Sequence, residues 1–241
     1  MRWGIFSDIH SNLEAFQAVL ASFAQEHIDR YICLGDIVGY GANPRECIQE
    51  VKRFKPITVA GNHDWAACER FDVKYFNSYA QTAIAWTAQN ITQEDKQYLG
   101  SLKLVSELGG FTIVHGSLHQ PERFEYILDA YSVESTLDIL NTQLCFIGHT
   151  HVPVTFIHRD GRCTACFRKK LALEADVKYV VNAGSVGQPR DGDPRATYVV
   201  YDSDNKEVEI KKVPYNIRKA KDKIIKAGLP KMLAERLGTG Q

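Results

Sequence analysis

Short runs of apolar residues recur along the chain, and each ends abruptly at glycine or at a polar residue. The runs are about four residues long and rich in β-branched and aromatic side chains, which is typical of strands buried on both faces. Six of them precede the segments Ser7–His10, Gly35–Asp36, Gly61–Asp64, His115–Gly116, Gly148–His151 and Asn182–Ser185. The pattern predicts short strands whose carboxyl ends carry polar side chains.

Helical periodicity fills the gaps between the early strands. Apolar residues recur at helical spacing from Leu13 to Phe23, and Ser11 with Glu14 has the spacing of a capping box. Further helices are predicted from Pro44 to Phe54 and from Tyr75 to Asn90. Alternation of strands and helices predicts a parallel sheet.

The pattern changes after residue 100. A hairpin is predicted around Gly109–Gly110, and strands dominate after residue 150. We expect these strands to form a second, largely antiparallel sheet packed on the first. The segment 216–237 reads as a helical tail with a break at Gly228–Pro230. Residues 1–241 are expected to form a single domain of the α/β class.

The composition limits the classes of partner that the protein is expected to bind. Of the 241 residues 44% are hydrophobic and 24% charged, and 29 basic residues balance 29 acidic ones, so no stable nucleic-acid partner is expected. No signal peptide or membrane span is predicted, and six scattered cysteines favour a reducing, cytoplasmic location. Cys163 and Cys166 lack a second pair with which to bind zinc and are expected to be free thiols on a hairpin.

The polar residues at the strand ends are the candidate functional site. Ligands of open α/β sheets bind outside the carboxyl ends of strands. Carboxylates, an amide and imidazoles without thiolates favour Mn²⁺, Fe or Zn²⁺, and the set offers more ligands than one four-coordinate site can use. Two ions sharing a carboxylate would use the larger set. The residues are Asp8, His10, Asp36, Asn62, His63, Asp64, His115, His149 and His151.

This ordered set resembles the motif series of the calcineurin-like metallophosphoesterases. The resemblance implies a four-layer αββα sandwich, with two mixed β-sheets flanked by helices. It also implies two divalent metal ions, with Mn²⁺ favoured and Fe, Zn²⁺ or Ni²⁺ as alternatives. It assigns Asp8, His10 and His151 to the first ion, Asn62, His115 and His149 to the second, and Asp36 to both. His63 would be the catalytic histidine, and Asp64 the carboxylate that orients it.

Departures from better-known members narrow the substrate. Protein Ser/Thr phosphatases and the symmetrical diadenosine tetraphosphate hydrolases of this superfamily carry an arginine shortly after the bridging aspartate, and the segment from Asp36 to Gly41 contains none. The chain is more similar to small bacterial and archaeal phosphodiesterases or diadenosine tetraphosphatase-like members, which predicts metal-dependent hydrolysis of a small phosphorylated substrate. The alternatives are a phosphomonoesterase or protein phosphatase-like activity, and a non-catalytic scaffold. Tyr40 and Arg190 are candidate substrate contacts. The lysines of the tail either form a solvated helix face or weakly attract polyanionic substrates.

Overall fold

The computed structural model describes all residues from 1 to 241, and its first sheet has six strands. Three parallel strands stand at one side of this sheet, and antiparallel strands from the second half of the chain complete it. In spatial order the strands are β3 (Ile57–Thr58), β2 (Arg30–Cys33), β1 (Arg2–Phe6), β11 (Ala196–Asp202), β12 (Glu207–Val213) and β9 (Lys170–Ala172).

The second sheet also has six strands and is mixed. Strands β5, β6 and β10 are parallel, and the remaining pairs are antiparallel. In spatial order they are β4 (Val105–Leu108), β5 (Phe111–Val114), β6 (Leu144–Ile147), β10 (Lys178–Asn182), β7 (Val154–Arg159) and β8 (Arg162–Cys166). The expectation that the late strands make a largely antiparallel second sheet is therefore wrong, because β11 pairs with β1 and extends the first sheet. The expectation of two mixed sheets is confirmed.

Side chains from both sheets meet in a shared core. Ile5 and Ile32 point between the sheets, whereas Phe6 and Cys33, one residue later in each strand, pack under the helices outside. Full burial of one such apolar side chain contributes about 1.5–3 kcal/mol. Two-sided burial explains why these strands are continuously apolar, since successive side chains point to opposite faces.

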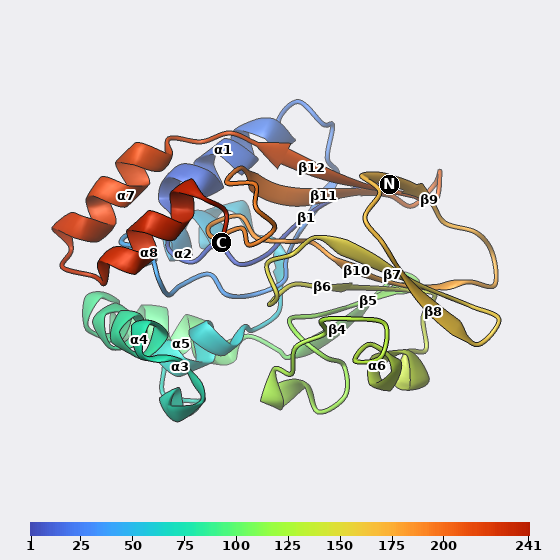
Figure 1. The fold of residues 1–241 in the computed structure, drawn as a ribbon, viewed down its shortest axis with the longest axis horizontal. Helices are drawn as coiled ribbons and strands as arrows, with labels where there is room; N and C mark the ends of the chain where they lie inside the picture. Colours follow the sequence, from blue (N-terminus) through green and yellow to red (C-terminus); the bar gives the residue numbers. More distant parts are fainter.

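Helices cover both outer faces of the sandwich. Helices α1 (Leu13–Phe23) and α2 (Pro44–Phe54) pack on the first sheet, and α6 (Glu134–Ile139) packs on the second. Figure 1 shows α1, the two sheets and α6 from top to bottom, which confirms the four predicted layers. No helix is long and apolar enough to cross a membrane.

The beginning of α1 differs from its prediction. Asn12, not Ser11, accepts the hydrogen bond of the helix cap, from the backbone N–H of Ala15 at 3.2 Å. Glu14 points away from the cap and forms ion pairs with Lys219 (3.1 Å) and Lys223 (2.6 Å) of the C-terminal segment. A long-range ion pair thus replaces the local capping contact.

The remaining helices gather at one end of the sandwich (Figure 1). The tail is helical within the predicted bounds and breaks at Gly228, which has a φ of +72°. Its apolar side chains form one buried cluster with Tyr40 and two alanines of α4. These helices are α3 (Asn62–Ala67), α4 (Ser78–Asn90), α5 (Gln93–Ser101), α7 (Ile217–Lys226) and α8 (Lys231–Glu235).

Candidate metal centre

All nine residues singled out at the strand ends are buried. They come from loops of both sheets, so folding brings together residues far apart in the chain. Asp8 and His10 follow β1, Asp36 follows β2, Asn62, His63 and Asp64 open α3 after β3, His115 follows β5, and His149 and His151 follow β6.

Asp8, His10 and His151 form the first group of potential metal ligands. His151 Nε2 lies 3.2 Å from Asp8 Oδ1, and His10 Nε2 lies 3.6 Å from the same oxygen and 3.1 Å from His151 Nε2. Ligand atoms that surround a tetrahedral ion at 2.0–2.1 Å would be about 3.3 Å apart. The spacing therefore fits three ligands of one ion.

Asp36, His115 and His149 form the second group. His115 Nε2 lies 3.3 Å from Asp36 Oδ2 and 3.1 Å from His149 Nδ1. The same Asp36 oxygen lies 3.6 Å from His10 Nε2 of the first group. Asp36 is thus the carboxylate that faces both groups.

In three histidines the hydrogen bond of Nδ1 determines which ring nitrogen can offer a lone pair to a metal ion. His10 Nδ1 lies 3.0 Å from Val38 O, and His151 Nδ1 lies 2.6 Å from Gln188 O. His115 Nδ1 lies 2.7 Å from a backbone carbonyl in the same way. A carbonyl oxygen only accepts, so each Nδ1 carries a proton. In the neutral form of each ring, the lone pair is therefore on Nε2, which faces the carboxylates. Lone pairs that face one another across 3.1 Å repel unless a cation or extra protons lie between them.

Two further buried oxygens have no hydrogen-bond partner in the protein. These are Asp8 Oδ1 in the first group and Asn62 Oδ1 at the start of α3. Buried polar atoms are almost always paired, and oxygen atoms beside imidazoles suit borderline divalent ions. The donor set therefore fits divalent metal ions.

The electrostatics of the metal-free site prepare most of the ligands. Despite the opposing effect of burial, neighbouring histidines hold the pKa values of Asp8 and Asp36 below the usual range. Burial lowers the pKa of His149 to about 3 and that of His151 to about 4. Although burial opposes it, Asp36 raises the pKa of His115 to about 9, so His115 has to release a proton when a metal binds.

The ligand loops have unusual backbone conformations. Residues other than glycine seldom adopt a positive φ, and each residue that does so costs about 1–3 kcal/mol of folding free energy. Backbone hydrogen bonds between the loops hold them, including Asp8 N–H to Gly35 O and His10 N–H to Asp36 O, both at 3.0 Å. The residues are Asp8 (φ 55°), His10 (48°), Asp36 (52°), His149 (68°) and His151 (63°).

His63 lies beside both groups with a free ring edge. Its backbone N–H donates to Asp36 Oδ1 at 2.9 Å, and its ring packs against those of Tyr40 and Phe76. Its Nδ1 has no hydrogen-bond partner, and burial lowers the pKa of the ring. A Cβ on residue 39 would come within 2.3 Å of that nitrogen, so glycine at this position leaves room for the ring.

Asp64 makes no hydrogen bond to the His63 ring, so an orienting effect of Asp64 on that ring would act through the backbone. Its carboxylate accepts from the backbone N–H groups of Ile37 (2.9 Å) and Gly61 (3.1 Å). Asp64 occupies the third position of α3, from which a carboxylate reaches back to the residue that caps the helix. Burial, reinforced by Asp36, raises the pKa of Asp64 to about 7.

A cavity of about 380 Å³ opens beside Asn62, His63 and His149. Tyr126 stacks on the His149 ring with centroids 3.8 Å apart and ring planes 16° apart. The sequence did not predict that Tyr126 lines the cavity, because Tyr126 belongs to a loop without helical or strand periodicity. The aromatic residues of the lining are Tyr40, Phe71, Tyr75, Phe76, Phe124 and Tyr126.

The other residues singled out in the sequence divide into near and remote ones. Tyr40 lies against the rings of His10 and His63, and the Arg190 guanidinium lies 5.9 Å from the Tyr40 ring centroid. The free thiols of Cys163 and Cys166 belong to the hairpin strand β8.

The turn after β10 supports the ligand loops. Asn182 Nδ2 donates to Gly148 O at 2.6 Å, and Ser185 Oγ donates to Asp8 O at 2.9 Å. These bonds connect the turn to the loops that carry Asp8 and His149. Asn182–Ser185 is therefore a strand-end turn that supports the candidate ligands.

Two adjoining groups of potential metal ligands, both faced by Asp36, lie beside a cavity on a four-layer sandwich, an arrangement that suits a metal-dependent hydrolase. The family model of the calcineurin-like phosphoesterase superfamily domain matches residues 1–206, and the chain belongs to this superfamily. It is accordingly a hydrolase acting on phosphate esters.

Similar proteins cover nearly the whole chain. The crystal structure of a metallophosphoesterase from Sphaerobacter thermophilus is 40% identical and superposes with a TM-score of 0.90, covering 100% of this chain and 99% of that one. An uncharacterised protein of Methanocaldococcus jannaschii is 40% identical over 242 residues, 98% of this chain and 97% of its own. The phosphodiesterase YfcE of Escherichia coli is 27% identical over 205 residues, 82% of this chain and 85% of its own.

Proposed function

We propose that this protein is a dinuclear metal-dependent phosphoesterase that hydrolyses small phosphodiesters or phosphoanhydrides. The observation that carries the proposal is the pair of buried ligand groups on either side of Asp36, with imidazole Nε2 atoms facing carboxylate oxygens at 3.2–3.6 Å. Pairs of ions that share ligands are typical of enzymes that cleave phosphate esters. The similarity to a phosphodiesterase supports the same class.

The proposal assigns each ligand to one of two ions. Asp36 would bridge the ions, and Mn²⁺ is the favoured metal, with Fe, Zn²⁺ and Ni²⁺ as alternatives. When bound, such ions activate water as a nucleophile and stabilise negative charge on phosphoryl oxygens. Asp8, His10 and His151 would hold the first ion, and Asn62, His115 and His149 the second.

His63 is the residue best placed to act on the leaving group. It lines the cavity, its backbone is bonded to Asp36, and its ring nitrogen is unpartnered. We assign to it a hydrogen bond to the phosphoryl group or proton donation to the leaving oxygen. Asp64 acts indirectly as a positioning residue, because it fixes the beginning of the helix that carries His63.

The aromatic cavity supports a small substrate with a planar group. Stacking of a nucleobase on an aromatic side chain contributes about 1–3 kcal/mol per base. A cavity of about 380 Å³ is within the size range of sites for small molecules. We therefore favour nucleotide or aryl esters over phosphoproteins as substrates. We expect no stable nucleic-acid partner. A non-catalytic scaffold would not need an unpartnered histidine beside a complete ligand set.

Metal removal and reloading test the proposal. Protein stripped with a chelator is expected to be inactive, and reloading with Mn²⁺ is expected to restore two bound ions per chain and hydrolysis of bis-p-nitrophenyl phosphate. Elemental analysis and a colorimetric assay measure the two quantities, with Zn²⁺, Fe²⁺, Ni²⁺ and Mg²⁺ in parallel. One bound ion or none, together with no hydrolysis of this ester or of p-nitrophenyl phosphate, would contradict the proposal.

Substrate preference is a second expected outcome. The segment from Asp36 to Gly41 contains no arginine to clamp a monoester dianion, so kcat/KM for a dinucleoside polyphosphate or a small diester should exceed that for a phosphoserine peptide by 10-fold or more, on the order of one lost charge-assisted hydrogen bond. Steady-state kinetics on the Mn²⁺-loaded protein measure the ratio. A phosphopeptide preference would instead favour the phosphatase-like alternative.

A further inference from the structure

Arg190 is a cation beside the metal centre with no carboxylate partner. Its backbone N–H donates to His151 O at 3.2 Å, which places the residue next to a ligand of the first group. Its side chain bonds to the neutral Gln188 Oε1 at 2.9 Å, and its Nε has no partner at all. A half-buried guanidinium without an anion is unusual, because burial of an unpaired charge is costly.

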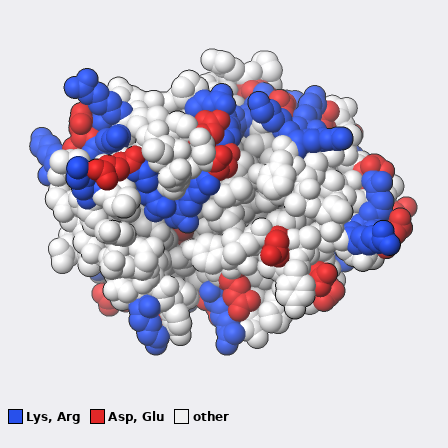
Figure 2. All heavy atoms as spheres, in the orientation of Figure 1, with Lys and Arg blue, Asp and Glu red and all other residues white.

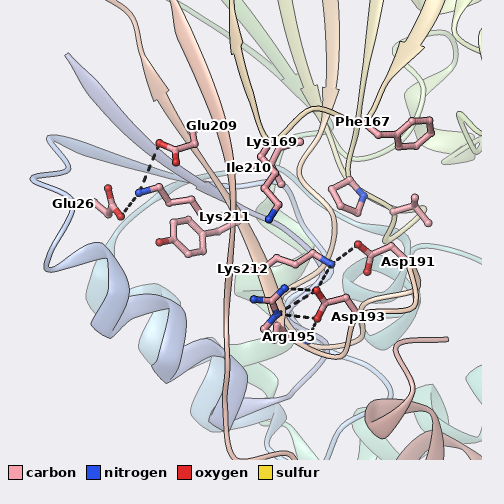
Figure 3. Close-up of a pocket in the computed structure, with 13 residues that line it drawn as sticks. Glu26, Phe167, Lys169, Asp191, Asp193, Arg195, Glu209, Ile210, Lys211 and Lys212 are labelled. Atoms are coloured by element: carbon pink, nitrogen blue, oxygen red, sulfur yellow. Dashed lines mark hydrogen bonds and ion pairs between the residues drawn. The ribbon is translucent and has the colours of Figure 1, made fainter.

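Two aspartates close to Arg190 in sequence do not neutralise it. Figure 3 shows Asp191 and Asp193 turned toward Lys212 and Arg195 instead. Asp193 lies 2.6 Å from Arg195 and 3.3 Å from Lys212. These residues line a surface hollow of about 850 Å³. Their charges are neutralised by ion pairs within the hollow, and Arg190 takes no part in those pairs.

The C-terminal segment brings a second arginine to the same place. Arg236 follows α8, and the adjoining Leu237 is buried against the cluster that contains Tyr40. Gly240 N–H donates to Arg236 O at 3.0 Å, and Gly240 O accepts from Gly192 N–H at 2.9 Å, which connects this turn to the loop after Arg190. Burial and the positive charge of Arg190 both lower the pKa of Arg236, as expected for two neighbouring cations.

Arg236 also lacks a side-chain carboxylate partner. Its Nε donates to the main-chain oxygen of Gln241 at 2.6 Å, and no aspartate or glutamate pairs with its guanidinium. A carboxylate at Gln241 would offset one of the two positive charges and not both. Figure 2 shows Lys and Arg side chains over the C-terminal helices and beside a hollow near the middle of this face.

We propose that Arg190 and Arg236 together bind a phosphoryl group of the substrate next to the one that is cleaved. The inference rests on the proposed two-metal function and deepens it. Two ions with two ionised aspartates leave the centre with two positive charges, to which the arginines add two more. That balance suits a substrate with several phosphoryl groups better than a diester with a single negative charge. Arg236 lies beyond residue 206, outside the part of the chain that the family model matches.

Kinetics on two substrates test the inference in the Mn²⁺-loaded full chain. Arg190→Gln and Arg236→Gln should each lower kcat/KM for diadenosine tetraphosphate by about 10- to 100-fold, mainly through KM, the scale of a lost charge-assisted hydrogen bond. The loss of kcat/KM for bis-p-nitrophenyl phosphate, which has a single phosphoryl group, should be clearly smaller than the loss for diadenosine tetraphosphate. Arg195→Gln and Arg218→Gln are matched controls, from the same loop and the same tail, and should leave both substrates unaffected.

Binding supplies a readout without metal or turnover. Calorimetry should show that inorganic tripolyphosphate binds the full chain after its metal has been removed. Arg190→Gln and Arg236→Gln should each weaken this binding by about 10-fold or more. Arg236→Lys should retain part of the affinity if charge matters, with an unchanged melting temperature to show that the tail remains folded.

The outcomes separate the two proposals. Arginine-dependent tripolyphosphate binding by a protein that hydrolyses no ester would support this inference and contradict the enzymatic function. Hydrolysis with tripolyphosphate affinities equal in parent and variants would overturn the inference and leave the function standing. Equal losses on the diester and the polyphosphate would also overturn it, because the arginines would then act on the cleaved group or on the fold.

Discussion

Replacement of Asp36 by alanine should abolish metal binding and activity together. The Asp36 Oδ2 atom lies 3.3 Å from His115 Nε2 and 3.6 Å from His10 Nε2, so its loss deprives both ligand groups of their shared carboxylate. We expect a fall of at least about 10³ in kcat/KM, on the order of the several kcal/mol that metal ions contribute to such reactions. Elemental analysis of the reloaded variant should show fewer than two ions per chain.

A thermal measurement provides an independent check. Ligands that bind only the folded state raise its melting temperature, so Mn²⁺ should stabilise the parent and not Asp36→Ala. Asp36→Asn keeps an acceptor for the His63 N–H and should still lose the ions, which separates charge from packing. The exposed Asp138 on α6 serves as a control, and Asp138→Ala should behave like the parent. Two ions retained in Asp36→Ala at parental affinity would show that Asp36 is not the bridge.

Replacement of His63 by alanine should leave both ions bound and still slow the reaction. If His63 acts on the phosphoryl group or the leaving oxygen, kcat should fall by roughly 10² to 10⁴, the usual scale for the loss of general acid catalysis. The fall should be smaller for a p-nitrophenyl ester than for an alkyl ester, because a leaving group of low pKa needs less protonation. Steady-state kinetics with both esters and metal analysis of the same sample measure the effect.

The geometry makes this a demanding experiment, because His63 also lies near His10 and Asp36 in a group that could hold an ion. A His63→Ala protein that retains only one ion would identify His63 as a ligand. Parental rates on alkyl esters would remove it from the chemistry altogether. The exposed His119 is the matched control, and His119→Ala should change neither quantity.

The positions of most candidate ligands could be predicted because they follow strands whose ends are buried on both faces. Ile5 and Phe6, for example, enter two different cores, and the chain must then leave the sheet at Ser7 and Asp8. Carboxyl ends of parallel strands lie at one edge of a sheet, so polar residues after several of them converge. Strand pairing could not be predicted in the same way, since an apolar run such as that of β11 suits either sheet.

Contacts between residues distant in sequence account for most of what the sequence did not predict. Glu14 has the spacing of a capping residue but pairs with Lys219 and Lys223, about 200 positions later. Asp64 follows His63 directly, yet its carboxylate turns back to the start of its helix. Tyr126 reaches the site only through the packing of a loop that has no local motif.

Five of the seven proposed ligands have left-handed backbone conformations, and hydrogen bonds between the loops hold them in place. The cost of these conformations is therefore offset by contacts within the folded chain. Differences in affinity among Mn²⁺, Zn²⁺ and Fe²⁺ should then arise from the chemistry of the ligand atoms, with little contribution from rearrangement of the loops.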